Sequence, residues 1–196
     1  WRMSPGEYSM DITLADLSSQ VVSAIMQDLE LDVFTPAASL LLTVMHHGGK
    51  DHMVKMKQVY DLAVILKKDE AIDWHWVIKE AKRFHILSLL MASVCLASQI
   101  TGVELPPQIK KMALSSRSVR LANNRYRQIG TMPSKWTTRS FIIRNWAFKI
   151  MSRDGAMVKM RLALWFLLKV LAPAMVPRKY HHLFTRRKIL SADGSI

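Results

Sequence analysis

The sequence has one cysteine, Cys95, so no disulfide can form within the chain. The residues around Cys95 are apolar, and we therefore expect a buried thiol rather than a nucleophile. A lone cysteine fits a reducing compartment, and no basic stretch followed by an apolar run opens the sequence as a secretory leader would. We therefore expect a cytoplasmic protein.

A second absence is an apolar run of the roughly 20 residues that a membrane-spanning helix needs. The most apolar stretch of the C-terminal half, residues 162–168, is much shorter, and Lys159, Arg161 and Lys169 flank it. Two alternatives remain for this stretch: a core helix packed on its neighbours, or an interfacial helix with its cations at the lipid headgroups. The second alternative would place the protein at the periphery of the inner membrane face.

Acidic residues are scarce in the second half of the chain. Residues 101–196 contain 3 Asp and Glu against 19 Lys and Arg, whereas residues 1–100 contain 12 against 9. The formal net charge of the whole chain is +13. Such a surplus indicates an anionic partner rather than a particular fold. The candidate partners are a nucleotide or other phosphorylated ligand and, through residues 116–190, a nucleic acid or an anionic membrane surface.

The sequence predicts sheet at one place only. Between residues 28 and 33, acidic residues alternate with branched apolar ones, which is typical of a β-strand. Residues 11–25, just before, favour a short helix. From Thr35 onward the patterns are helical, because Thr35 suits an N-cap and Pro36 suits a first turn that leaves its amide unpaired.

Several helices are predicted after Thr35. Gly48 and Gly49 are expected to end the first helix, because glycine tolerates the positive φ of a helix terminus. A second helix is expected over residues 51–67, and Asp73 is expected to cap a third that breaks near residues 84–86. The buried face of the second helix is predicted to contain Met53, Met56, Tyr60, Ala63 and Leu66.

The pattern of the C-terminal half predicts two further helices, over residues 140–152 and 156–171. The fold class expected from these patterns is mainly α: an antiparallel helical bundle with a small N-terminal strand remnant and a basic helical C-terminal extension. We expect three parts: residues 1–34 as the remnant of an upstream α/β catalytic domain, residues 35–115 as the helical core, and residues 116–196 as the basic extension and tail.

An ordered set of short motifs lies between residues 40 and 106. They are Leu40-Leu41-Leu42, His47-Gly48-Gly49-Lys50, Asp61-Leu62-Ala63, Ile72-Asp73-Trp74 and Leu105-Pro106. In their order and spacing they resemble the uncharacterised nucleotidyltransferases of the polymerase-beta superfamily, and they match only the C-terminal helical part of such proteins. The chain departs from that pattern at Asp51, where such families often have His, and at Met53, where they often have an aromatic residue.

The resemblance implies a metal-dependent transfer of a nucleotidyl group, with Mg²⁺ and a nucleoside triphosphate as cofactors of the parent protein. That chemistry needs a Gly-Ser turn for the phosphates and strand carboxylates for the metal. The one Gly-Ser pair, Gly194-Ser195, is at the opposite end of the chain. We therefore expect no catalytic residue within this chain. The expected partner is an upstream catalytic domain, and Trp1-Arg2 would be the end of the last strand of that domain.

The predicted strand at residues 28–33 contains the acidic residues of this chain that most resemble a metal site. Asp28, Glu30 and Asp32 would all face one way on a strand, as metal-binding carboxylates must. The alternative is a solvated acidic face without bound metal. Without a phosphate-holding turn beside these residues, we favour the solvated face.

The second motif supplies the substrate-side candidates His47 and Lys50, which would face the catalytic domain or its nucleotide. Asp61 is the third candidate, and it has two alternatives: an exposed ion pair with Lys57, or an acceptor that ties its helix to the His47 turn.

Two groups of residues invite a functional interpretation but have ordinary explanations. His46, His47 and His52 suggest zinc, although no cysteine cluster supports them and a polar helix end explains them as well. Trp74 and Trp76 are expected to be core and rim aromatics rather than stacking platforms.

A function of another class also fits the net positive charge: a non-enzymatic basic helical module that binds nucleic acid or an anionic membrane surface.

Overall fold

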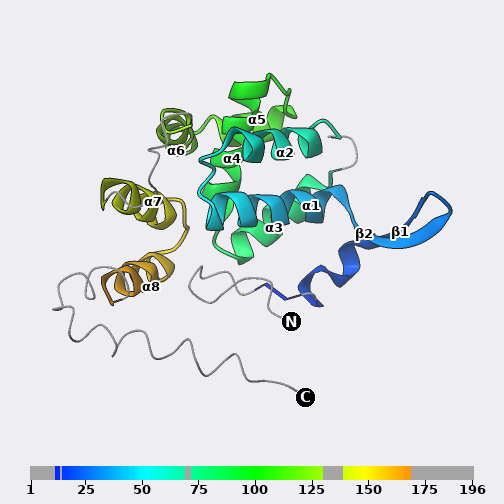
Figure 1. The fold of residues 1–196 in the computed structure, drawn as a ribbon, viewed down its shortest axis with the longest axis horizontal. Coiled ribbons are helices and arrows are strands. Elements are labelled where there is room, and N and C mark those ends of the chain that lie inside the picture. Colours follow the sequence, from blue (N-terminus) through cyan, green and yellow to red (C-terminus); the bar gives the residue numbers. More distant parts are fainter. Residues whose placement is uncertain (1–11, 14, 69–71, 130–138, 169–196) are drawn as a thin grey trace, which may run out of the picture.

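The structure is a computed structural model that describes residues 12–13, 15–68, 72–129 and 139–168. These residues are mostly helical, with one two-stranded antiparallel sheet near the N-terminal end, which confirms the mainly α fold class (Figure 1). In the described part of the chain, no helix combines the length and the apolar character needed to cross a membrane.

The sheet is a hairpin that projects from the helices. A 3-10 helix, η2 (Ala15–Gln20), leads into β1 (Val21–Met26), which pairs with β2 (Leu29–Phe34) from Val21–Phe34 to Met26–Leu29. The predicted strand is confirmed, but the helix expected over residues 11–25 is wrong beyond Gln20. The β-branched side chains at the start of β1 favour an extended backbone once a second strand is there to pair with it.

The first long helix changes its winding instead of ending at its glycines. Helix α1 (Pro36–Thr43) starts at Thr35, whose hydroxyl accepts the amide hydrogen of Ala38 at 3.3 Å, as the sequence predicts. It then widens into a π-helix, η3 (Val44–Lys50), so the expected helix end at Gly48 is wrong.

Gly48 is required by packing rather than by backbone conformation. A Cβ at this position would lie 2.9 Å from Leu89 Cδ1 and 3.2 Å from Ser93 Oγ, both on α4 (Leu87–Thr101). The missing side chain therefore lets η3 lie directly against α4.

Helix α2 (Met56–Leu66) begins five residues later than predicted, and its buried face was predicted in part: Ala63 and Leu66 are buried, as is Met53 before the helix. Met56 and Tyr60, expected in the core, are 42% and 54% exposed. The two preceding residues with positive φ, His52 and Met53, break the helical path and reset its phase. The buried residues of α2 are Gln58, Val59, Leu62, Ala63 and Leu66.

The next two helices follow the sequence prediction closely. Asp73 caps α3 (Trp74–Arg83) by accepting the Trp76 amide at 2.9 Å, and the predicted break falls between α3 and α4. Trp74 and Trp76 are partly buried against the core. Helix α4 ends at Gly102 with φ +69°.

Helix α4 lies at the centre of the bundle, with every residue from Ser88 to Ala97 buried. It includes Cys95, whose pKa is raised by burial, so this thiol is structural, as expected.

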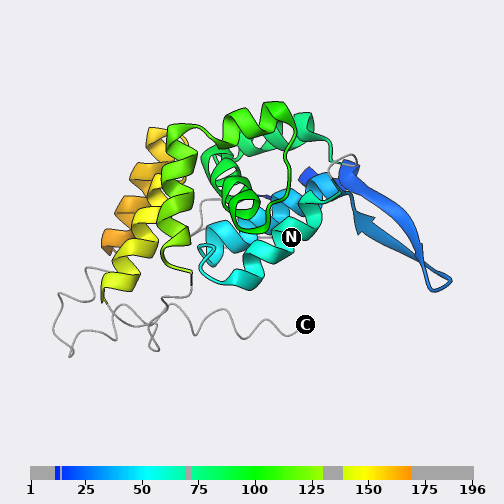
Figure 2. The ribbon, with the colours of Figure 1, turned by 90° about the horizontal axis from the view of Figure 1, so that it is seen from above.

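The C-terminal helices are α5 (Pro107–Ala113), α6 (Ser116–Tyr126), α7 (Arg139–Met151) and α8 (Ala156–Phe166). Helices α7 and α8 were predicted, whereas α6 was missed, although Ser115 caps it in the usual way. Helices α6, α7 and α8 lie side by side at the end of the molecule opposite the hairpin (Figures 1 and 2). Residues 169–171 of the last predicted helix lie outside the described residues.

One carboxylate joins these helices to the bundle. Asp154, between α7 and α8, accepts from the amide and the hydroxyl of Ser88 at 2.9 and 2.5 Å, which satisfies the start of α4. Its own amide donates to the carbonyl of His85 at 2.9 Å, and Arg117 of α6 lies 3.4 Å from its carboxylate. The basic helices are therefore held on the core by specific polar contacts.

A Gly48→Ala variant should be less stable than the wild type. The added methyl overpacks the η3–α4 contact, which typically costs about 1–3 kcal/mol and exceeds the gain of about 1 kcal/mol in helix propensity. The free energy of unfolding by urea measures the loss. Gln99→Ala, on the exposed side of α4, is the matched control and should change stability by less than about 0.5 kcal/mol. Equal or greater stability of Gly48→Ala would contradict the close packing described above.

Candidate functional site

Polar side chains from η3 and α2 converge at the end of η3. His47 Nε2 lies 3.2 Å from Asp61 Oδ2, and both His46 Nε2 and His47 Nδ1 lie 3.7 Å from Asp51 Oδ2. Gln58, which is buried, donates from Nε2 to Asp51 Oδ2 at 3.1 Å. We call these five residues the polar cluster.

The π-helix brings the members of the cluster together. The amide of Asp51 donates to the carbonyl of His46 at 3.1 Å, five residues back, instead of four as in an α-helix. Asp51 therefore lies one turn above both His46 and His47. In a regular α-helix that ended at Gly48, Asp51 would not be held over these rings.

The structure places two of the three substrate-side candidates in contact. Asp61 faces His47 across the α2–η3 contact, which is the second of the two alternatives for this carboxylate, although its side chain is 41% exposed rather than buried. Lys50 is the last residue of η3, and its side chain lies outside what the structure describes.

The strand carboxylates do not fit the Mg²⁺ ions that the resemblance implies. Asp28 is in the turn of the hairpin with φ +63°, so it does not share the alternation of β2. Glu30 and Asp32 are exposed on β2, where Glu30 accepts a hydrogen bond of 2.7 Å from Ser23. A two-metal site needs carboxylates that converge beside a phosphate-holding turn, and this hairpin does not provide that arrangement.

His52 is separated from the other two histidines. Its pKa is lowered to about 3, first by burial and then by the positive charges of Arg125, Lys149 and Arg153. The imidazole is therefore neutral at physiological pH. Histidines 46 and 47 are grouped with Asp51 and not with His52.

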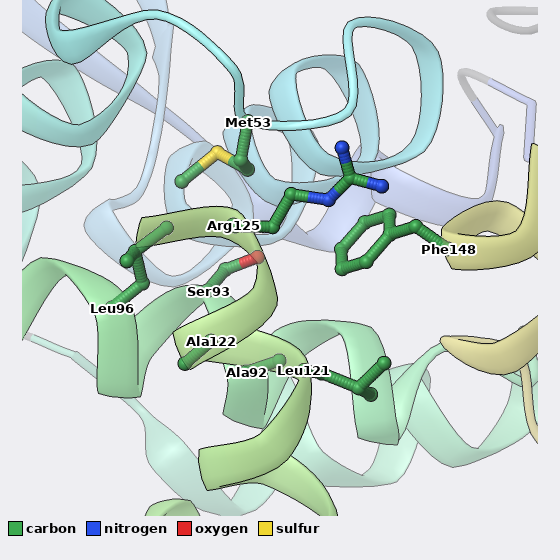
Figure 3. A pocket seen from close by; sticks show the side chains of 8 residues that line it. All are labelled: Met53, Ala92, Ser93, Leu96, Leu121, Ala122, Arg125 and Phe148. Carbon is green, nitrogen blue, oxygen red and sulfur yellow. The ribbon is translucent and has the colours of Figure 1, made fainter. Parts of the chain in front are cut away.

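The cations near His52 are buried between α6, α7 and the end of η3. Arg125 is 1% exposed, and its guanidinium carbon lies 3.8 Å from the centre of the Phe148 ring (Figure 3). It donates to Gln128 Oε1 at 2.7 Å and to Asn145 Oδ1 at 2.8 Å. Both side chains are neutral, so they accept hydrogen bonds from the Arg125 guanidinium without neutralising its positive charge.

Burial lowers the pKa of both arginines. That of Arg125 falls to about 9, first through burial and then through the charge of Arg144, and that of Arg153 falls to about 10 through burial, which Asp154 partly opposes. Both side chains remain charged at neutral pH. The interior beside His52 therefore has a positive potential.

A narrow cleft lies beside Arg125, between α4, α6 and α7. Its lining includes Arg125, Phe148, Met53 and Ser93 (Figure 3). Ser93 also lies against Gly48, so the cleft and η3 share one wall of α4.

The sequence interpretation missed this burial, because it treated the C-terminal arginines as surface charges. The sequence did contain a signal for the burial of Arg125. Ser118, Leu121, Ala122 and Arg125 follow a spacing of three and four along α6, and all four are buried on the side that packs on α4. Arg125 thus belongs to the buried stripe of its helix.

Replacing His52 should change how stability depends on pH. Since the pKa of His52 lies near 3 in the folded state and near 6.5 when unfolded, the unfolded chain binds the extra proton between these values. Stability is thus lost as pH falls below about 6.5, by at most about 1.4 kcal/mol per pH unit for this group. A His52→Gln variant should lack this component.

Urea unfolding between pH 7 and pH 4 measures the difference between the two proteins. His75→Gln, which alters an exposed histidine on α3, is the control and should keep the wild-type slope. A His52→Gln slope that equals the wild-type slope would show that His52 is not held neutral.

Comparison with known proteins gives one match. A family model described as uncharacterised nucleotidyltransferase matches residues 1–102, slightly more than half of the chain. The matched range includes the hairpin, α1 to α4 and the whole polar cluster. Searches of curated proteins and of solved structures returned no match.

Proposed function

This chain belongs to the uncharacterised nucleotidyltransferase family, and on that premise we propose that it forms the helical, substrate-side portion of a nucleotidyltransferase. In the proposed reaction, an acceptor nucleophile attacks the α-phosphorus of a nucleoside triphosphate and pyrophosphate leaves. The Mg²⁺-binding carboxylates would belong to an upstream catalytic domain.

The observation that carries this proposal is the polar cluster, which lies within the range matched by the family. Gln58 and Asp61 of α2 orient Asp51 and His47, so the polar groups are fixed before a ligand arrives. Preorganised polar groups of this kind suit a wall that positions a substrate. We propose that Lys50 extends this wall and contacts a phosphate.

The buried cations support an anionic substrate. Arg125 has neutral hydrogen-bond partners, and Arg153 retains its charge in spite of burial. Phosphoryl-type reactions depend mainly on positioning and on stabilising negative charge. A positive interior next to the wall would favour the triphosphate over neutral ligands.

Pyrophosphate release from the four nucleoside triphosphates with Mg²⁺ tests the proposal. The chain alone should be inactive, whereas a longer gene product that includes an upstream catalytic domain should release pyrophosphate. His47→Ala and Lys50→Ala should lower kcat/KM by roughly 10–100-fold, because they remove groups that face the substrate. His75→Ala is the matched control.

Two outcomes would contradict this proposal. Turnover by the 196-residue chain alone would show that the catalytic carboxylates are within it. Unchanged kcat/KM in both the His47 and the Lys50 variants would remove the polar cluster from the substrate side.

A second function is favoured by the surface of α8. Met157, Met160 and Leu164 are 70%, 60% and 54% exposed and follow a spacing of three and four along the helix. Arg161, beside them, is also exposed. An apolar stripe with flanking cations is typical of a helix that lies in the interface of an anionic membrane. We propose membrane binding as the alternative, and nucleic-acid binding as the rival outcome of its test.

Co-sedimentation with phosphatidylglycerol vesicles tests the alternative. The wild type should bind, and Leu164→Asp should bind at least about tenfold more weakly, because it places a negative charge in the apolar stripe. Val64→Asp, at an exposed position of α2, is the control for an added charge. Binding to single-stranded RNA but not to vesicles, with a steep dependence on salt, would favour nucleic acid instead.

A further inference from the structure

Three side chains in the polar cluster have the donor atoms of a metal site. His46, His47 and Asp51 each offer one ligand atom, and these three atoms all lie within 4.8 Å of one another. Imidazole nitrogen and carboxylate oxygen bind Zn²⁺ at about 2.0–2.2 Å, so donors around a tetrahedral ion lie roughly 3.3 Å apart. The distances from His46 Nε2 and His47 Nδ1 to Asp51 Oδ2 are both 3.7 Å, close to that value.

The protonation of His47 leaves one nitrogen for a cation. The Asp61 carboxylate only accepts hydrogen bonds, so the proton of a neutral His47 ring lies on Nε2, 3.2 Å from Asp61 Oδ2. Nδ1 then carries a lone pair, and in the structure it is buried and makes no hydrogen bond. It faces an oxygen of Asp51, which also carries lone pairs. A cation between these two atoms would convert a repulsive contact into an attractive one.

Two side chains of α2 orient two of the proposed ligands through hydrogen bonds. Asp61 orients the His47 ring, and Gln58 donates to Asp51. Histidines that bind metals usually donate their second ring N–H to a carboxylate, and metal-binding carboxylates are themselves hydrogen-bonded. Gln58 and Asp61 are three residues apart and therefore neighbours on one face of α2.

The backbone under the ligands is constrained as well. His46 and His47 lie on the π-helical turn and Asp51 directly follows it. Because Gly48 has no side chain, that turn packs closely against α4. π-helical turns are rare and occur frequently at functional sites. A rigid base of this kind lowers the entropy that metal binding would otherwise cost.

We propose that His46 Nε2, His47 Nδ1 and Asp51 Oδ2 bind one divalent transition-metal ion, with Zn²⁺ as the best match. The His46 side chain is 56% exposed and that of Asp51 is 36% exposed, so a fourth coordination position faces solvent. Gln58 and Asp61 are positioning residues. This site differs from the carboxylate Mg²⁺ site of the proposed transfer, and it does not depend on that reaction.

Zn²⁺ titration of the metal-free, full 196-residue chain tests the proposal, with a chromophoric chelator as competitor. The wild type should bind one equivalent. His47→Gln and Asp51→Asn should each weaken binding at least about 100-fold, and Asp61→Asn should weaken it about 10–100-fold through the lost orientation of His47. Circular dichroism of each variant establishes that the helices are intact.

Co²⁺ gives a second readout that needs no variant. In the wild type, Co²⁺ should produce the strong visible bands of a four-coordinate nitrogen and oxygen site, without the charge-transfer band of a thiolate. A thiolate band would assign the metal to Cys95 and overturn the proposal. Absence of Zn²⁺ binding would overturn it too.

Two controls separate the site from other histidines. His75→Gln alters an exposed histidine on α3, and a double variant with His181→Gln and His182→Gln removes an adjacent pair from the C-terminal sequence. Both should bind Zn²⁺ as the wild type does, whereas loss of binding in the double variant would overturn the assignment. Because no nucleotide is present, the result is independent of pyrophosphate release, so either proposal can fail while the other stands.

Discussion

The contact between η3 and α4 at Gly48 is the constraint on which the polar cluster depends. With no side chain at this position, the π turn lies directly on Leu89 and Ser93 of the most buried helix. That contact fixes the place where the chain leaves η3, and therefore the positions of His47 and Asp51. Helix α2 then packs against the same turn and supplies the two side chains that orient them. Core packing and site geometry are thus produced by the same few residues.

The cationic interior beside His52 depends on a different balance of forces. Burying Arg125 and Arg153 costs solvation energy, and for Arg125 the hydrogen bonds to Asn145 and Gln128 together with the Phe148 ring offset part of that cost. Burial lowers the pKa of His52, and the retained charges lower it further and give the cleft a positive potential.

Local signals in the sequence predicted those parts of the structure in which neighbours along the chain decide the outcome. Thr35 and Asp73 cap their helices because a side-chain oxygen reaches an amide three residues away. The buried face of α2 was predicted only in part. Ala63 and Leu66 are buried as expected, whereas Met56 and Tyr60 are exposed, because the turn at His52 and Met53 sets the phase of the helix. The contact between Asp61 and His47 was one of two open alternatives, because periodicity does not tell which neighbour a side chain meets.

The sequence by itself determined the mainly α class, several of the helix boundaries, the buried Cys95 and the ordered motifs that connect the chain with its family. These depend on composition and on interactions over three or four residues. Only the tertiary structure decided that Gly48 continues a helix, that Arg125 is buried, and that Asp51 joins His46 and His47. Each of these results from close packing between segments far apart in the sequence, and the energy of such contacts does not depend on local pattern.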